Sequence, residues 1–340
     1  MSKPQARALG FDREFAAAVA GVGELAAAFP ELPVGDVDGR RTAFDEIMTK
    51  MKAMMPPQQV PGLTKREHKV TVADGSTISL FEFRPSKVPV SPSPAIYHVH
   101  GGGMILGSVE MFEASAALKA EEYGLPFFSI NYRLAPEHPH PTPVHDTYSG
   151  LTWLHSHASE LGIASSRILV IGDSAGGGIA GGMVLMARDK QLDPPIALQM
   201  LIYPMLDDRN IQPHPDIDPF TMWKTADNET GWRALLGSAA AQEASVDGHE
   251  YAAPARANNL AGLPPTYIDV GQLDLFAKED LQYAARLADA GVAVEFHLYP
   301  GLPHAFEGMG ATTSIVKSAV ANRKRVVEDF KLGEMQESTQ

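Results

Sequence analysis

A short apolar run that leads into a turn of small residues constrains this chain more than any other feature. Residues 168–171 are apolar and largely β-branched, as in a strand buried in a parallel sheet, and a helix-forming run follows to about Arg188. The turn between them, residues 172–176, reads GDSAG and matches G-x-S-x-G. Between a strand and a helix, such glycines leave room for a sharp serine backbone that presents its hydroxyl above the sheet. The stretch therefore predicts that Ser174 is a nucleophile at a helix N-terminus.

A second glycine pattern overlaps the first and is typical of dinucleotide-binding proteins. Residues 176–181 read GGGIAG, which fits G-x-G-x-x-G. That fingerprint needs its first glycine at the end of the strand and an acidic residue about 20 positions later, at the end of the next strand. Here residues 173–175 intervene, and the next expected strand, 197–203, is followed by Pro204. We therefore interpret this turn as the site of a nucleophilic serine and not as a nucleotide-binding site.

The composition excludes several classes of function. The formal net charge is −13 with a pI near 5.4, and no basic cluster stands out, so nucleic acid is not an expected partner. The chain has 0 cysteines, which excludes disulfides and thiolate sites and fits a cytoplasmic protein. No run approaches the roughly 18 apolar residues of a membrane span. The apolar segment 15–29 follows Asp12, Arg13 and Glu14, so we expect an amphipathic helix and a retained N-terminus rather than a signal peptide.

The order of predicted elements divides the chain into four segments. Residues 1–60 are expected to be helical, and residues 61–204 begin with a hairpin around Asp74 and continue with alternating strands and helices. Residues 205–251 break this alternation, contain several prolines and carry Phe220, Met222, Trp223 and Trp232, which suggests an insertion that folds over another part. Residues 252–340 resume the alternation. This pattern predicts a mostly parallel sheet with helices on both faces.

Candidate catalytic side chains lie in loops that follow the expected strands. Ligands of open α/β sheets bind beyond the carboxyl ends of the strands, where the loops with 100–103, Ser174, Asp274 and His304 meet. The chain order serine, acid, histidine is that of the α/β-hydrolase triad. His304 is then placed to accept the Ser174 proton, and Asp274 to orient the imidazole.

Other histidines and acids offer alternatives. His297 and Asp269 lie within expected strands, and His100 heads the glycine loop, so each fits the catalytic roles less well. Two histidine groups could be metal ligands, at positions 138, 140 and 145 and at positions 155 and 157. Without spaced carboxylate or cysteine partners, solvated positions are the better interpretation, and no metal or other cofactor is expected.

Six motifs together give the chain a clear resemblance. They are HGGGM at His100, YRLAPEHP at Tyr132, GDSAGG at Gly172, YPMLDDR at Tyr203, GQLDLFAKED at Gly271 and PGLPHAFEG at Pro300. From about residue 95 to its end the chain resembles the hormone-sensitive lipase family of α/β-hydrolase carboxylesterases, in its GDSAG branch. The resemblance implies an eight-stranded sheet and a helical cap built from residues 1–60 and 205–251. It also implies an oxyanion hole formed by the amides of Gly102, Gly103 and Ala175.

The expected activity is hydrolysis of short- to medium-chain carboxylic esters through an acyl-enzyme. Met104 stands where the family often has a bulky aromatic, and Gly178 where it often has Asn, so the pocket shape is left open. We assign Met104, Phe220, Met222 and Trp223 to the substrate pocket. The same triad could act on a lactone, an amide or a bulky natural ester, and a receptor without catalysis is a further alternative. The resemblance allows a homodimer through the strand expected at 292–298.

Overall fold

An eight-stranded sheet forms the centre of the computed structural model, which describes residues 9–20, 31–54, 60–88, 91–221, 223–237, 240 and 248–333. The strands are β1 Thr64–Thr71, β2 Thr77–Arg84, β3 Ser93–Val99, β4 Phe127–Asn131, β5 Ile163–Asp173, β6 Leu198–Ile202, β7 Thr266–Gly271 and β8 Val294–Tyr299. Their order across the sheet is β1-β2-β4-β3-β5-β6-β7-β8. The pairs β1/β2 and β2/β4 are antiparallel, and all other neighbouring pairs are parallel. This confirms the predicted α/β-hydrolase sheet.

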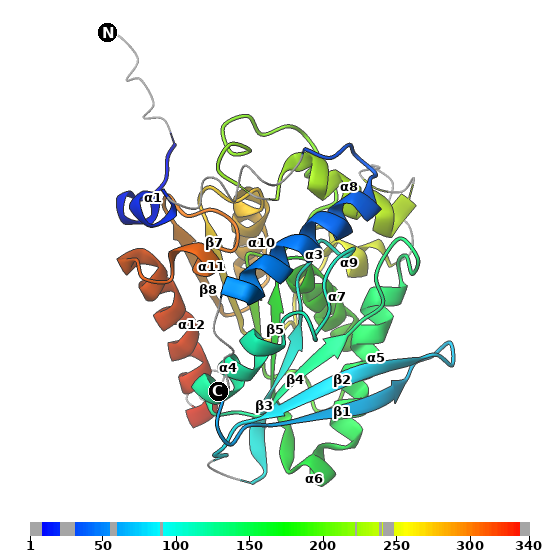
Figure 1. Ribbon diagram of the computed structural model, residues 1–340. Helices are drawn as coiled ribbons and strands as arrows, with labels where there is room; N and C mark the ends of the chain where they lie inside the picture. The colour runs from blue at the N-terminus through cyan, green and yellow to red at the C-terminus, as the bar shows by residue number, and fades with distance from the viewer. Residues whose placement is uncertain are drawn as a thin grey trace.

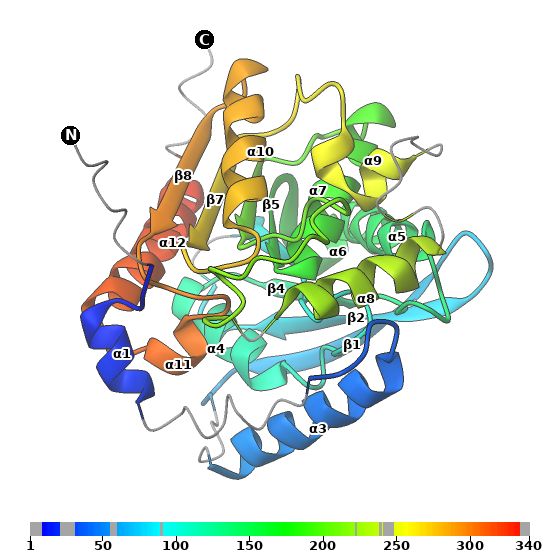
Figure 2. The same cartoon turned by 90° about the horizontal axis from the view of Figure 1, so that it is seen from above.

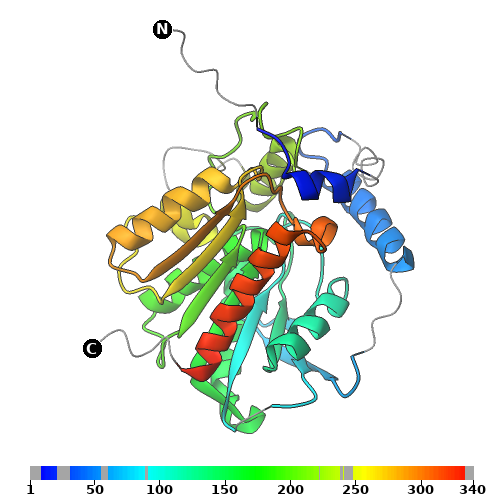
Figure 3. The ribbon, with the colours of Figure 1, turned by 90° about the vertical axis from the view of Figure 1, so that its left-hand side faces the viewer.

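Helices cover both faces of the sheet (Figure 1). They are α1 Arg13–Val19, α3 Val37–Met54, α4 Glu113–Tyr123, α5 Thr142–Ser156, α6 Ala158–Leu161, α7 Ala175–Asp189, α8 Thr225–Leu236, α9 His249–Ala252, α10 Ala277–Asp289, α11 Glu307–Gly310 and α12 Ser314–Leu332, with a 3₁₀ turn, η2, at Pro254–Arg256. Helices α5, α7 and α10 pack into one apolar core, and α1, α4 and α12 pack into a second core on the opposite face. Figure 3 shows α12, in red, along the second face.

Alternation along the strands explains why two cores form. Successive side chains of a strand point to opposite faces of the sheet. In β5, Ile168 and Val170 belong to the first core, whereas Leu169 and Ile171 belong to the second. Because both faces are covered by helices, the central strand is apolar throughout, which is the pattern that its sequence predicted.

The structure extends one strand beyond the sequence prediction. Strand β5 begins at Ile163, five residues before the apolar run that marked it, where Ile163 pairs with Ser93 of β3. Within the segment that breaks the alternation, helix α8 begins at Thr225, and its first turn is held by Asp227, whose carboxylate accepts the Lys224 N–H at 2.9 Å. Trp232 itself is 0% exposed and belongs to the first core, so it does not face solvent.

Helices α3 and α8 are far apart in sequence but lie side by side over the carboxyl edge of the sheet (Figure 2). The Arg40 guanidinium of α3 donates to Asp227 of α8 across 2.8 Å. The N–H of Gly35 donates to the Thr230 hydroxyl at 3.0 Å. These contacts join the N-terminal part of the chain to the segment that interrupts the alternation of strands and helices.

Candidate active site

Ser174 occupies the sharp turn between β5 and α7. Its backbone has φ 57° and ψ −123°, a conformation that residues with a side chain rarely adopt. The two motif glycines make this turn sterically accessible. A Cβ on Gly172 would lie 2.4 Å from the Gly176 carbonyl oxygen, and a Cβ on Gly176 would lie 2.2 Å from that of Val99. The spacing G-x-S-x-G is therefore required by the close packing of the turn against β3.

His304 and Asp274 meet Ser174 from the loops after β8 and β7. The His304 Nε2 lies 2.9 Å from the Ser174 Oγ, and its Nδ1 lies 2.7 Å from the Asp274 Oδ2. The Asp274 side chain is 0% exposed and that of His304 is 11% exposed. The other Asp274 oxygen accepts the Phe276 N–H at 2.9 Å. With Nδ1–H directed at Asp274, Nε2 is free to accept the serine proton.

Aromatic rings hold the imidazole in place. Tyr203 and Phe276 pack edge-to-face against His304, with ring centroids 4.6 Å and 5.3 Å away. Such contacts restrict the ring to an orientation in which its two nitrogens face Ser174 and Asp274. The three predicted catalytic side chains are thus brought together by the structure.

The alternative residues lie in other contacts. His297 pairs with Glu295 at 2.7 Å, and Asp269 is buried against the Arg323 guanidinium at 2.6 Å. The ring of His100 is buried and its Nδ1 faces the Gly101 carbonyl oxygen at 2.8 Å, and burial lowers the pKa of His100 to about 4. None of the three contacts the Ser174 hydroxyl.

The glycine loop after β3 runs directly against the serine turn. A Cβ on Gly101 would lie 3.2 Å from the Ser174 Cβ, and Gly102 and Gly103 have φ values of 126° and 58°. The loop is closed by the N–H groups of Ile105 and Leu106, which donate to the Gly102 carbonyl at 3.1 and 2.8 Å. Within the described part of the chain, the N–H groups of Gly102, Gly103 and Ala175 donate to no other residue. They are available to a ligand.

Tyr132 supports this loop, although the sequence reasoning gave it no role. Its hydroxyl donates to the His100 carbonyl at 2.9 Å, and its ring stacks on the His100 ring with centroids 4.4 Å apart. Tyr132 opens the YRLAPEHP motif, one of the six motifs that carry the family resemblance. Tyr132 follows directly after a predicted strand of the same sheet that leads into the glycine loop. This position was the signal in the sequence that could have indicated its role.

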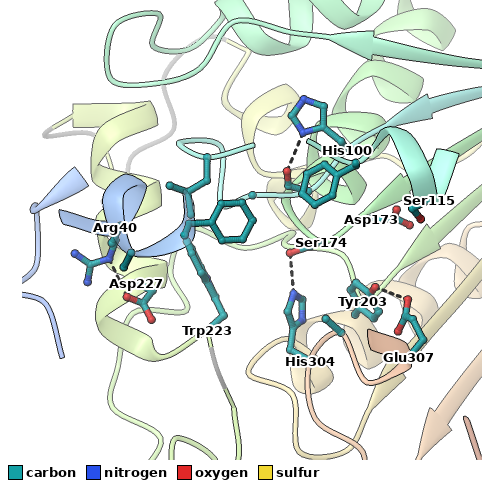
Figure 4. Close-up of a pocket in the computed structure, with 18 of the residues that line it drawn as sticks. Arg40, His100, Ser115, Asp173, Ser174, Tyr203, Trp223, Asp227, His304 and Glu307 are labelled. Atoms are coloured by element: carbon teal, nitrogen blue, oxygen red, sulfur yellow. Dashed lines mark hydrogen bonds and ion pairs between the residues drawn. The ribbon is translucent and has the colours of Figure 1, made fainter. Parts of the chain in front are cut away.

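A cavity of about 380 Å³ adjoins Ser174 and His304 (Figure 4). Trp223 lines it, as predicted from the sequence, and a Cβ on Gly103 would lie 2.1 Å from its ring. Met104 does not line it, because that side chain is 0% exposed and points into the first core. Phe220 packs edge-to-face on Phe11, outside the cavity lining. Met222 lies outside the described residues.

Gly178 also plays no part in the cavity. A Cβ at this position would lie 2.0 Å from the Met205 carbonyl oxygen. The glycine therefore lets α7 approach the loop after β6, and the departure from the family pattern changes helix packing rather than the pocket. The prediction that Met104 lines the pocket was wrong, because the sequence alone could not show that its side chain turns into the core.

Charged groups in the cavity wall were missed by the sequence reasoning. Asp173, which precedes the serine, accepts from the Lys119 ammonium at 3.0 Å and faces the His98 Nε2 at 3.1 Å. Burial raises the pKa of Asp173, but Lys119 and His98 outweigh it and hold this pKa well below its usual value. Burial lowers the pKa of Lys119, yet the charges of Asp173 and Glu307 leave it raised. Both groups are ionised at neutral pH.

Helices α3 and α8 close the opposite side of the cavity. Arg40, Phe44 and Asp227 contribute to its lining. Next to Arg40, the Arg41 guanidinium donates to the carboxylate of Glu137 at 2.6 and 2.8 Å, which lowers the pKa of Glu137 to about 2. The ion pair between Arg41 and Glu137 thus attaches the layer over the active site to the core.

Neither a metal cluster nor a membrane helix is found in the described ranges. No group of three or more His, Asp or Glu side chains there is arranged to hold a metal ion. No helix in the same ranges combines the length and the apolar character needed to cross a bilayer.

The fold and the Ser-His-Asp contacts define the class of this protein as an α/β hydrolase with a serine nucleophile at the elbow position. Comparison with known proteins narrows the class. The Abhydrolase_3 family, described as having the alpha/beta hydrolase fold, matches residues 96–308. Carboxylesterase NlhH of Mycobacterium tuberculosis is 32% identical over 263 residues, which is 74% of this chain and 78% of that protein. Esterase LipI of the same species is 34% identical over 228 residues, 64% of this chain and 66% of LipI.

A solved structure agrees with these relatives. The bacterial heroin esterase superposes with a TM-score of 0.83 at 34% identity, and the match covers 94% of this chain and 98% of that one. The chain therefore belongs to the hormone-sensitive lipase family of α/β-hydrolase carboxylesterases, as its motifs predicted.

Proposed function

We propose that the protein is a serine carboxylesterase that hydrolyses short- to medium-chain esters through an acyl-enzyme intermediate. The observation that carries this proposal is the continuous hydrogen-bonded series from Ser174 Oγ through His304 to Asp274, with 2.9 Å and 2.7 Å contacts at the floor of a cavity. In this geometry a hydroxyl and its base are within reach of each other, and the base is oriented by a third group.

The reaction follows from the positions of these groups. Ser174 attacks the ester carbonyl while His304 Nε2 takes its proton, and the buried Asp274 stabilises the resulting imidazolium. The free amides of Gly102, Gly103 and Ala175 face the developing oxyanion, each contributing about 3 kcal/mol to the transition state. His304 then returns the proton to the leaving alcohol. Water activated by the same histidine releases the acid.

Relatives favour esters over the other substrates of such a triad. Their names include carboxylesterase, esterase and ethyl acetate hydrolase, and none of these names refers to a lactone or an amide. A cavity of about 380 Å³ is near the lower end of the range for small-molecule sites, which supports short to medium acyl chains. A receptor without catalysis would have no need of the His304 contact to Ser174.

The direct test is a p-nitrophenyl ester series from acetate to palmitate, measured with the wild type and Ser174→Ala. We expect a maximum of kcat/KM at a short or medium chain, and a loss of kcat of at least about 10³-fold in the variant. An unchanged circular dichroism spectrum controls for folding. Ser174→Ala activity within tenfold of wild type, or efficiency that still rises beyond about twelve carbons, would contradict the proposal.

We also propose a cytoplasmic location, because a chain with 0 cysteines suits a compartment in which disulfides are not formed. Fractionation of native cells tests it: activity in the cytosolic fraction supports the location, and activity in a secreted or envelope fraction contradicts it.

A homodimer through the edge of the sheet is a further proposal. Strand β8 ends the strand order, and Leu298 on it is 40% exposed. An edge strand presents unpaired N–H and C=O groups that can pair with a second copy of the chain. Light scattering should therefore give twice the mass of the chain, and Leu298→Lys should give the monomer mass. A monomer in the wild type contradicts the proposal.

A further inference from the structure

The cavity beside Ser174 has two unlike ends. On one side lie aromatic and aliphatic side chains of the glycine loop and of helices α3 and α4, together with Trp223. On the other side lies a set of polar side chains that we call the polar arm: His98, Ser115, Lys119, Asp173, Tyr203 and Glu307. Figure 4 shows Asp173, Ser115, Tyr203 and Glu307 on one side of Ser174, and Arg40, Asp227 and Trp223 on the other. The ring of Tyr203 packs against His304, but the hydrogen bonds that join Ser174, His304 and Asp274 involve no residue of the polar arm.

The polar arm is held together by charged hydrogen bonds. Lys119 donates to Asp173 across 3.0 Å, and the Tyr203 hydroxyl donates to the Glu307 Oε1 at 2.6 Å. Arg323 donates to the same Glu307 oxygen at 2.9 Å from behind the wall. Ser115 lies one helical turn before Lys119 on α4, and its hydroxyl makes no hydrogen bond within the described part of the chain. The arm is therefore a fixed structure and not a chance meeting of flexible side chains.

These charged groups are only partly enclosed. The side chains of Lys119, Asp173 and Glu307 keep 24%, 20% and 29% of their surface exposed. All three line the cavity. One oxygen of each carboxylate, Asp173 Oδ1 and Glu307 Oε2, is buried and has no hydrogen-bond partner in the described part of the chain. An alkyl chain packed against this wall would leave both oxygens without a partner, which is unfavourable. A substrate that occupies this side of the cavity must therefore offer a polar group that can donate a hydrogen bond.

We propose that the polar arm binds a hydroxyl group on the substrate, so that the enzyme prefers hydroxyl-bearing esters to plain alkyl esters. A hydroxyl can donate to the carboxylate of Asp173 or Glu307 and also accept from the Lys119 ammonium. An ammonium group on the substrate is repelled by Lys119, and a carboxylate is repelled by Asp173 and Glu307. A neutral group that both donates and accepts matches all three. This inference rests on the proposed esterase function.

The experiment compares matched ester pairs by pH-stat titration with the wild type. On the acyl side the pairs are ethyl hexanoate against its 2-, 3- and 6-hydroxy derivatives, and on the alcohol side hexyl acetate against 6-hydroxyhexyl acetate. We expect kcat/KM to be at least about tenfold higher for one hydroxyl ester than for its parent, because sites that hydrogen-bond a substrate group discriminate strongly against its absence. The pair that responds identifies the half of the substrate that enters the arm.

Two variants and one control connect the preference to the arm. Lys119→Met keeps the length of the side chain and removes the ammonium, and the hydroxyl-to-alkyl ratio should fall to within about twofold of one. Ser115→Val changes an exposed position on α4 that carries no internal hydrogen bond in the described part of the chain, and it should lower the same ratio severalfold. Lys324→Met removes an equal charge from a side chain that is 48% exposed and should leave the ratio unchanged. Comparing ratios within each variant cancels any general loss of activity.

The outcomes separate this inference from the proposed function. A wild type that hydrolyses every hydroxyl ester and its parent equally overturns the inference alone, as does a ratio that persists in both Lys119→Met and Ser115→Val. A preference for ethyl 6-aminohexanoate over the 6-hydroxy ester also overturns it, in favour of a cation site. If no ester is hydrolysed by the wild type at all, the proposed function itself fails.

Discussion

Backbone strain surrounds the serine at the scale of single residues. Ser174 has φ 57°, and Ala305, the residue after His304, has φ 52°, so unusual backbone lies at one partner of the 2.9 Å contact and directly beside the other. Such conformations cost roughly 1–3 kcal/mol each and persist only where the surroundings impose them. Around Ser174 the conformation is imposed by the close packing of Gly172 and Gly176 against neighbouring backbone atoms. Accurate placement of the nucleophile therefore depends on residues without side chains.

Gly176→Ala tests this dependence. The new methyl group would lie 2.2 Å from the Val99 carbonyl oxygen and 2.3 Å from that of His100, so the serine turn must move. We expect kcat/KM for a p-nitrophenyl ester to fall at least about hundredfold. Gly308→Ala is the matched control, because nothing lies within 4 Å of a Cβ there, and its activity should stay near wild type. Equal activity in the two variants would refute the steric explanation.

Asp274→Asn tests the role of the buried carboxylate. An amide cannot stabilise the imidazolium and favours the wrong tautomer of His304, so kcat should fall about 10³- to 10⁴-fold with KM nearly unchanged. Stopped-flow or steady-state kinetics on one ester measures the effect, and the exposed Asp216→Asn gives the baseline for the same chemical change. A loss of kcat below tenfold would show that Asp274 is not part of the triad.

At the scale of elements, the order of strands places the catalytic loops together. Strands β5, β7 and β8 are parallel, so the turns that follow them meet at one edge of the sheet. Helices α3 and α8 lie over this edge and are joined by Arg40, which is nearly buried with 4% of its side chain exposed. Arg40 also donates to the Pro33 and Asp36 carbonyl oxygens. One arginine thus fixes both the start of α3 and its contact with α8.

A double-mutant cycle separates these two roles. Arg40→Ala, Asp227→Ala and the double variant are compared by urea unfolding, and we expect a coupling energy of about 1–2 kcal/mol because the pair is largely shielded from water. The part of the loss in unfolding free energy of Arg40→Ala that exceeds the coupling energy measures the contacts of Arg40 to the start of α3. A coupling energy near zero would mean that the pair does not hold α3 to α8.

At the scale of the whole molecule, the sequence predicted the features that depend on local pattern. The apolar run at 168–171, the glycines around Ser174 and the chain order of Asp274 and His304 were sufficient for the sheet and for the three side chains that meet. The positions of side chains in the cavity could not be predicted in the same way. In the sequence, Met104 and Trp223 are equally good candidates for the substrate pocket. Only tertiary packing decides that Met104 enters the core and that Trp223 lines the cavity.

The polar arm was missed for a related reason. Lys119 lies 54 positions before Asp173 in a helix with no motif, and Glu307 follows the last motif histidine. Each looks like an ordinary surface charge in the sequence. Only the tertiary fold, which packs α4 on the sheet and brings Lys119 to Asp173 at the end of β5, makes them part of the cavity wall.

The pH dependence of stability is a property of the whole fold, and Asp280 contributes to it. Neither of its carboxylate oxygens has a hydrogen-bond partner in the described part of the chain, and burial, with the charges of Glu279 and Asp274, raises its pKa well above the usual value. The folded state then keeps a proton that the unfolded chain loses above about pH 4. Stability is therefore lost as pH rises from there toward the folded pKa.

Asp280→Asn removes this cost, because the amide cannot ionise. Its melting temperature should match wild type near pH 4 and exceed it increasingly as pH rises toward 8. Calorimetry at several pH values measures the difference, with the exposed Asp216→Asn as control. A difference that does not depend on pH would show that Asp280 does not act through its proton.

The central claim, that Ser174 is the activated nucleophile, is tested most directly by covalent labelling. Wild type is treated with diethyl p-nitrophenyl phosphate, and the site and extent of phosphorylation are read by peptide mass mapping while ester hydrolysis is followed in the same sample. We predict that a single phosphoryl group attaches to Ser174 and that activity falls in proportion to its occupancy. Full activity with Ser174 labelled, or inactivation with the label on another residue, would contradict the account.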